Sequence, residues 1–247
     1  MNKKVSFLVC GTQKGGTTAL AQYLNGHSGI FIPKEKEIHF FDNETINWNE
    51  PSYKNYHQHF EEADTDKLWG EATPIYMYWE FAPRRIWHYN PKMKIILILR
   101  NPISRCYSHW SMEYNRDLES KEFVQAINLE AIRARENLPF QHRVFSYIDR
   151  GYYCHQIRNI WRYFGKESTL VLRQEELQSE PNNVLQRISS FLEISSFKKV
   201  DNVKVHPGTY KEGMKESTKV YLKKVFYNEI KELELMLGWD CSEWLRL

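Results

Sequence analysis

Cysteine is scarce in this sequence, and long apolar runs are missing. The four cysteines among 247 residues form no CxxC pair and no Cys/His spacing typical of a metal site, which excludes a disulfide scaffold and a zinc module. We expect reduced thiols and no bound metal, with Cys10 buried in a strand. No apolar run approaches the ~18–20 residues of a membrane-spanning helix, so we expect no membrane span.

Charge of one sign is also in short supply. The 34 basic and 31 acidic residues leave a net charge of +3, which is too balanced for general nucleic-acid binding but allows a local basic pocket for one anionic ligand. After the basic start MNKK, the apolar run VSFLVC is too short for a signal peptide. We therefore expect a cytoplasmic protein that binds no nucleic acid.

The sequence does contain an alternation of strand-like and helix-like segments. Near-continuous apolar runs predict buried strands at Val5–Cys10, GIFI, Leu68–Ala72, Lys94–Arg100 and Thr169–Arg173. Helices are predicted at Thr17–Asn25, from Ile103 onward, and at Glu122–Glu136, Tyr153–Phe164, Pro181–Leu192 and Lys219–Leu237. This alternation predicts one α/β domain over residues 1–247, with a mostly parallel central sheet flanked by helices.

The first strand runs into a glycine-rich loop, GTQKGGTTAL. Gly11 and Gly16 have the spacing of a Walker A loop, but the lysine is Lys14, inside the loop, and not the residue after the second glycine. Such a loop can close its backbone N–H groups around a phosphate at the start of the following helix. The alternative is a tight turn that needs glycine for backbone reasons alone. The anion contacts are predicted at Gly11, Thr12, Gln13, Lys14, Gly15, Gly16, Thr17 and Thr18.

The strand KIILILR ends in a cation. A phosphoryl-transferring enzyme with a glycine loop needs an acid near such a strand end to hold magnesium, but this strand ends in Arg100. Arg100 and Ser108, on the next helix, can form a second anion clamp. The alternative for Arg100 is a surface salt bridge. Two clamps without a metal-holding acid favour a nucleotide with phosphates at two positions.

The segments GTQKGGTTAL, KEIHFFD and ILRNPISRCYSHW together resemble the sulfotransferases that use 3′-phosphoadenosine 5′-phosphosulfate (PAPS). The likeness is strongest to the heparan-sulfate N- and 3-O-sulfotransferase branch. It continues through GYYCHQIRNIWRYF and TLVLRQEEL and covers nearly the whole chain. The resemblance implies a P-loop-like sulfotransferase fold, PAPS as the donor with 3′-phosphoadenosine 5′-phosphate (PAP) as its product, no metal, and a glycan or other small acceptor.

The resemblance also implies roles for single residues. In this family the loop lysine, here Lys14, contacts the oxygen that bridges sulfate and phosphate, where negative charge develops during in-line attack. The family's 3′-phosphate clamp falls on Arg100 and Ser108. Its general base falls on Glu37. Glu35 is the rival base, and His39 supports or replaces Glu37. An extended segment would place Glu37 and His39 on one face. A solvated Glu37 and a packed structural His39 remain the alternatives.

Two further segments are assigned only by the resemblance. HPGTYKEGM is similar to the family's loop over the nucleotide, and it supplies candidate contacts to the 3′-phosphate and adenine at Gly208, Thr209, Tyr210 and Lys211. An ordinary exposed loop is the alternative there. GEATPIYMY departs from the heparan-sulfate enzymes, because Ala72 stands where they carry a lysine. The acceptor contacts are expected at Glu71, Thr73, Tyr153 and Gln156.

Three functions remain open from the sequence. The first is a sulfotransferase that moves SO₃ from PAPS to a hydroxyl or an amine. The second is a P-loop kinase of small molecules, which would need magnesium and ATP. The third is a non-catalytic module that binds a nucleotide or a sulfated ligand and has no use for Glu37.

Overall fold

The computed structural model describes residues 3–200 and 213–246. Its internal contacts divide the chain into two compact units. The first unit consists of Met1–Leu99 and Asn159–Val205, and the second of Arg100–Arg158 and His206–Leu247. A single domain over the whole chain stays a prediction.

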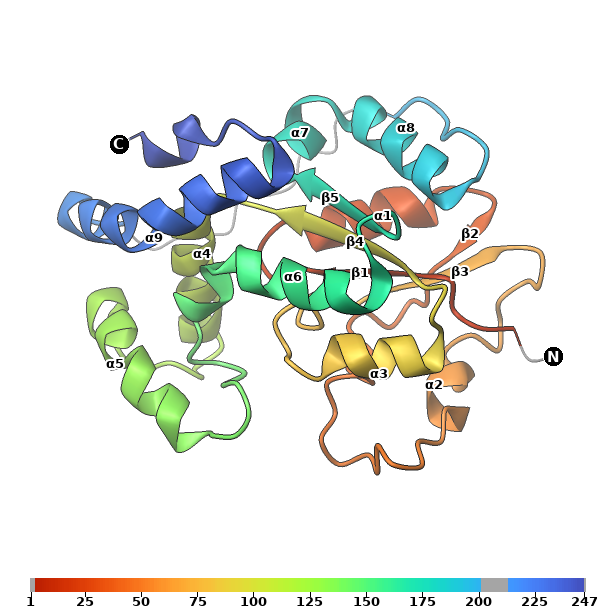
Figure 1. Ribbon diagram of the computed structural model, residues 1–247, viewed down its shortest axis with the longest axis horizontal. Helices are drawn as coiled ribbons and strands as arrows, with labels where there is room; N and C mark the ends of the chain where they lie inside the picture. Colours follow the sequence, from red (N-terminus) through yellow and green to blue (C-terminus); the bar gives the residue numbers. More distant parts are fainter. Residues whose placement is uncertain (1–2, 201–212, 247) are drawn as a thin grey trace. The chain divides into compact units, whose positions relative to one another are not determined.

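The first unit is built on a five-stranded sheet with the strand order β2-β3-β1-β4-β5. All of its strand pairings are parallel, which confirms the α/β prediction (Figure 1). β4 is buried at every position after its first residue, because helices cover both faces of the sheet. The strands are β1 (Phe7–Gly11), β2 (Ile30–Phe31), β3 (Leu68–Ala72), β4 (Lys94–Leu99) and β5 (Thr169–Arg173).

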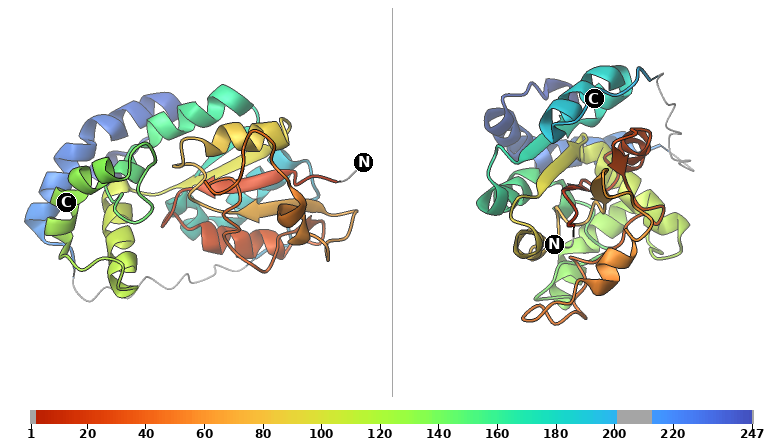
Figure 2. Two further views of the ribbon diagram at one scale, coloured as in Figure 1. Left: turned by 90° about the horizontal axis from the view of Figure 1, so that it is seen from below. Right: turned by 90° about the vertical axis from the view of Figure 1, so that its right-hand side faces the viewer.

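Helices of the first unit cover the two faces of this sheet. Side chains of alternate strand positions, such as Val9 and Ile96, form a core with Leu20 of α1 and Ile188 of α8. Figure 2 shows α3 on the opposite face from α1. The helices of this unit are α1 (Thr17–Asn25), α2 (Lys54–Gln58), α3 (Ala82–Tyr89), the C-terminal half of α6 (Tyr153–Phe164), α7 (Gln174–Ser179) and α8 (Pro181–Leu192).

The regular elements in the described residues of the second unit are all helices. Its main helices are α4 (Pro102–Asn115), α5 (Phe123–Glu136) and α9 (Glu216–Leu237). The short 3-10 helix η1 (Asp149–Gly151) precedes α6, and η2 (Ser242–Leu245) follows α9. Asn101 caps α4, because its side-chain oxygen accepts a hydrogen bond from the Ile103 N–H at 2.9 Å. Pro102 then occupies the first helical position, which proline tolerates.

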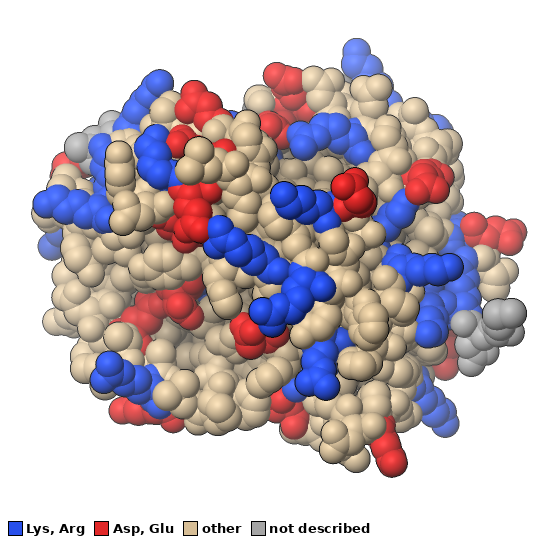
Figure 3. Space-filling model, viewed as in Figure 1, with Lys and Arg blue, Asp and Glu red and all other residues tan. Residues whose placement is uncertain are grey.

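Most predicted elements occur with the predicted bounds or within a few residues of them. The predictions omitted α3 and α7, whose 8 and 6 residues are too few for a clear helical periodicity. The four cysteines form no disulfide bond and are buried. No helix of the described ranges combines the length and the apolar character needed to cross a membrane. On the face drawn in Figure 3, basic side chains are interspersed with acidic ones.

Candidate active site

The glycine loop lies where β1 ends and α1 begins. The Thr12 N–H donates to the Ile98 carbonyl at 2.8 Å, and the Gly15 N–H donates to the Thr12 carbonyl at 2.9 Å. A Cβ on Gly15 would lie 2.5 Å from the Ile98 oxygen, and Gly16 has a φ of 101°. Both positions therefore need glycine for backbone reasons, as the turn alternative predicts.

The remaining loop residues and the start of α1 have features that suit an anion. Lys14 is half-buried and has a φ of 68°, a conformation that lysine seldom adopts. Thr12 and Thr17 are buried, whereas Thr18 is exposed in the first turn of α1. Gly16 is the N-cap of α1 and has no side chain to cap the helix. A helix start of this kind presents backbone N–H groups and a positive dipole end to an anion.

The segment KEIHFFD, residues 36–42, is called the acidic segment below. The side chains of its predicted site residues lie close together. Glu37 and His39 have φ values of 64° and 55°, so the segment is not extended at these two residues. Their side chains still meet, with His39 Nε2 lying 3.6 Å from Glu37 Oε2. On its other side, His39 Nδ1 lies 2.9 Å from Oδ2 of Asp42, which is fully buried.

The two carboxylates decide the protonation of His39. The hydrogen bond to Asp42, followed by the interaction with Glu37, raises the pKa of His39 to about 9. The imidazole is therefore a cation near neutral pH, without a lone pair to accept a proton. Glu37, whose side chain is 33% exposed, is then the group of this pair that can act as a base. Asp42 was missed, although the D that ends KEIHFFD is its signal in the sequence.

Lys36 joins the acidic segment to the glycine loop. Its ammonium group donates to the Thr18 hydroxyl and lies 3.8 Å from Glu37 Oε1. Burial lowers the pKa of Lys36, although the neighbouring Glu37 acts in the opposite direction. The rival base Glu35 points elsewhere, since its carboxylate pairs with His59 Nδ1 at 2.9 Å. Glu37 and Thr18, which follows the loop, thus share Lys36 as a contact.

Glu71 lies in a buried network behind this segment. Its carboxylate accepts hydrogen bonds from the hydroxyls of Tyr56 at 2.6 Å, Tyr76 at 2.9 Å, and Thr73. Burial raises the pKa of Glu71, and the three hydroxyl donors oppose this shift. The Tyr76 oxygen also accepts the Phe40 N–H at 3.0 Å, which ties the network to the acidic segment. Glu71 and Thr73 are both buried, so their contact with an acceptor stays a prediction.

The predicted clamp residues Arg100 and Ser108 both belong to the second unit. Arg100 directly follows β4 and is half-buried, and Ser108 lies on α4 with 6% of its surface exposed. The Tyr153 hydroxyl donates to the Arg100 carbonyl at 2.8 Å, and the Gln156 amide donates to the Tyr152 carbonyl at 2.8 Å. Tyr153 and Gln156 are buried and bonded to backbone, so their predicted acceptor contacts also stay untested. Gly208, Thr209, Tyr210 and Lys211 lie outside the described residues.

The second unit also contains a cavity that the sequence did not predict. It has a volume of about 540 Å³ and lies beside α4, α5 and the start of α9. Four aromatic rings line it, from Tyr107, Trp110, Tyr114 and Phe123. The aromatic spacing along α4 is the signal that could have revealed it, because residues three and four apart share a helix face.

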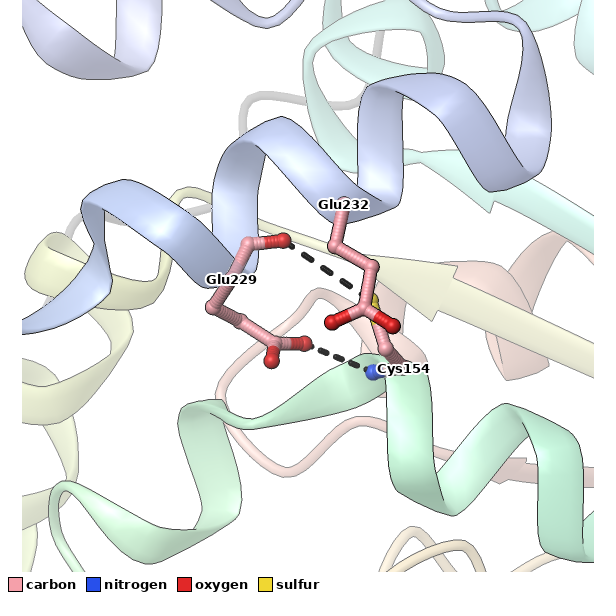
Figure 4. Close-up of side chains that lie close together, drawn as sticks. All are labelled: Cys154, Glu229 and Glu232. Atoms are coloured by element: carbon pink, nitrogen blue, oxygen red, sulfur yellow. Dashed lines mark hydrogen bonds between the residues drawn. The ribbon is translucent and has the colours of Figure 1, made fainter.

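One group of side chains in the described ranges has ligand atoms close enough for a metal ion. Figure 4 shows Cys154, Glu229 and Glu232, whose candidate ligand atoms lie within 4.8 Å of one another. The Glu229 carboxylate accepts the Cys154 N–H at 2.7 Å, and the thiol donates to the Glu229 carbonyl. Glu232 pairs with Arg158. Burial raises the pKa of the Cys154 thiol. These contacts explain the cluster as a support for the start of α6.

Comparison with known proteins places this geometry in a family. The sulfotransferase domain family matches residues 4–235. A mouse (Mus musculus) bifunctional heparan sulfate N-deacetylase/N-sulfotransferase 3 is 31% identical over 196 residues, which cover 76% of this chain and 22% of the relative. A human (Homo sapiens) heparan sulfate glucosamine 3-O-sulfotransferase 5 is 27% identical over 194 residues, which cover 76% of this chain and 53% of that relative. The chain thus spans about half or less of the length of these relatives.

Solved structures agree on the fold. The sulfotransferase from Alicyclobacillus acidocaldarius has a TM-score of 0.86 and 25% identity, and the match covers 99% of this chain and 100% of that one. A mouse sulfotransferase, SULT7A1, solved in complex with PAP, has a TM-score of 0.51 and 15% identity over 93% of this chain and 66% of that one.

The parallel sheet, with a glycine loop between β1 and α1, defines an α/β protein with a P-loop-like turn. The chain belongs to the sulfotransferase domain family. The family match argues against the P-loop kinase.

Proposed function

We propose that this chain transfers a sulfuryl group from PAPS to a hydroxyl or an amine of a carbohydrate or another small acceptor, without a metal ion. The observation that carries the proposal is the contact through Lys36, which joins Thr18 of the loop region to Glu37. A carboxylate able to take a proton therefore lies beside the loop that the family uses for the phosphosulfate.

In the proposed reaction, Glu37 takes the proton of the acceptor group as its oxygen or nitrogen attacks sulfur in line. The bond from the acceptor atom to sulfur forms, and the bond from sulfur to the bridging oxygen breaks. The electron pair of the broken bond stays on the phosphate of the departing PAP. Lys14 and the N-terminal end of α1 neutralise this developing charge.

His39 is assigned a positioning role in this mechanism. Asp42 holds the protonated ring, and the ring in turn lies beside the Glu37 carboxylate. A neighbouring cation favours the ionised form of a carboxylate, which is the form a general base needs. The buried Glu71 network supports the same segment through the Phe40 N–H.

The donor and acceptor assignments rest on less direct support. Arg100 and Ser108 are proposed to bind the 3′-phosphate, and the PAP complex of the mouse relative supports PAP as the product. A carbohydrate acceptor is proposed because the curated relatives carry heparan sulfate in their names. Ala72, in place of the lysine of those enzymes, argues for a different glycan or small molecule.

Transfer of radioactive sulfate from labelled PAPS tests the proposal. The acceptors would be heparan-derived oligosaccharides, a glycolipid, and simple alcohols and amines, each with EDTA and with Mg²⁺. We expect label in one acceptor class at equal rates in EDTA and Mg²⁺. Transfer that EDTA abolishes would contradict the metal-free mechanism. Phosphoryl transfer from Mg-ATP, with no sulfate transfer, would contradict the whole proposal.

A further inference from the structure

Lys36 occupies a position that the mechanism above does not use. Its side chain is 32% exposed, and its ammonium group contacts the Thr18 hydroxyl on one side and lies 3.8 Å from the Glu37 carboxylate on the other. One partner belongs to the first turn of α1, where an anion is favoured, and the other is the proposed base. The ammonium group therefore lies between the two groups that the reaction must bring together.

Ordinary surface electrostatics does not account for this placement. A surface lysine gains little from an exposed ion pair and loses side-chain freedom when it is held in place. Lys34 and Lys36 are both exposed residues, but the ammonium group of Lys36 contacts the Thr18 hydroxyl and lies near the Glu37 carboxylate. The segment after Lys36 also places two non-glycine residues, Glu37 and His39, in the left-handed region. Backbone strain of this kind clusters at functional sites, where the surrounding structure holds it.

We propose that Lys36 binds the sulfuryl group of the donor and stabilises the charge on its oxygens during transfer. The inference rests on the proposed function and deepens it. Lys14, within the loop, is assigned to the phosphate end of the breaking bond, and Lys36 to the sulfur end. Lys36 keeps its proton throughout. The proton of the acceptor passes to Glu37, and the electron pair of the broken bond leaves with PAP.

PAPS and PAP separate this role from a merely structural one, because they differ by the sulfuryl group. Titration calorimetry in EDTA, without acceptor, would measure both affinities for wild type, Lys36→Met, Lys36→Arg and the exposed control Lys34→Met. Methionine keeps much of the aliphatic side chain but removes the charge. Thermal unfolding of each variant establishes that it is folded.

We expect Lys36→Met to weaken PAPS binding roughly 10- to 100-fold, the size of a charge-assisted hydrogen bond. Its affinity for PAP should stay within roughly 3-fold of wild type, because PAP lacks the contacted group. Lys36→Arg should keep most of the PAPS affinity, and Lys34→Met all of it. Equal losses for PAPS and PAP would overturn the inference, since Lys36 would then support the loop as a whole. Unchanged PAPS affinity in Lys36→Met would overturn it as well.

The same titrations separate this inference from the proposed function. Wild-type protein that binds neither nucleotide in EDTA would overturn the proposed function, and the role of Lys36 with it. Wild-type protein that binds both, together with a normal Lys36→Met variant, would overturn the role of Lys36 alone.

Discussion

Glu37 and Glu71 are two carboxylates of the same unit in opposite surroundings. Glu71 is 1% exposed and accepts hydrogen bonds from three hydroxyl groups. The Glu37 side chain is 33% exposed and lies beside Lys36 and His39. A buried carboxylate with its acceptor sites filled is suited to holding structure. A neighbouring cation favours the ionised form of a carboxylate, and an accessible carboxylate can meet a substrate. The surroundings, and not the residue type, therefore distinguish the base from the support.

The largest expected effect is on turnover, at Glu37. Glu37→Gln removes the proton acceptor while keeping the shape of the side chain, so kcat should fall roughly 10²- to 10⁴-fold. PAP affinity should change little, because the role belongs to the transition state. Glu35→Gln is the matched control, since Glu35 pairs with His59 instead. Kinetics with saturating PAPS measure the effect. Turnover near that of wild type in Glu37→Gln would contradict the assignment of Glu37 as the general base.

The next largest effect is on the affinity for PAP, and it tests the role of Arg100 in the second unit. Arg100→Ala should weaken PAP binding roughly 10- to 100-fold while leaving ADP affinity unchanged, because only PAP carries the 3′-phosphate. Arg116→Ala, an exposed arginine of the same unit, is the control. Calorimetry measures both ligands. Equal loss for PAP and ADP would show that Arg100 does not read the 3′-phosphate.

Glu71 should show the reverse pattern to Glu37. Glu71→Gln places an amide among three hydroxyl donors, which should lower the free energy of unfolding by about 1–3 kcal/mol. Its kcat should stay within roughly 10-fold of wild type. If Glu71→Gln were as stable as wild type but inactive, Glu71 would have a catalytic role and not the structural role assigned to it here.

The two tyrosines of the network should differ in their effect on turnover. Tyr76→Phe should reduce kcat more than Tyr56→Phe, because Tyr76 alone of the two accepts the Phe40 N–H. Urea unfolding and kinetics measure these effects.

The smallest effect is the pH dependence of stability. The folded pKa of His39, at about 9, is raised above its ordinary 6.5. The stabilisation from its charged form is therefore fully present below about pH 6.5 and is lost as the pH rises through about 9. The Tm advantage of wild type over His39→Gln should shrink over this window. An advantage that grows toward pH 9 would contradict the charged imidazole between two carboxylates.

The sequence was informative where a feature is local and limited where it depends on distant contacts. The strands and the glycine loop are local, and they occur as predicted. The site around Glu37 is not local. His39 meets Glu37 through left-handed backbone, and the hydrogen bond to Asp42, ahead of the one to Glu37, keeps the imidazole of His39 charged. The burial of Glu71 depends on Tyr56 and Tyr76, which periodicity does not place beside it.

The most direct test of the central claim, a donor site for PAPS, is calorimetric titration of the wild-type protein with PAP and with ADP in EDTA. The account predicts that PAP binds roughly 10- to 100-fold more tightly than ADP, by the 3′-phosphate contacts alone, and that Mg²⁺ changes neither affinity. Equal affinities for the two nucleotides, or binding that appears only with Mg²⁺, would contradict it.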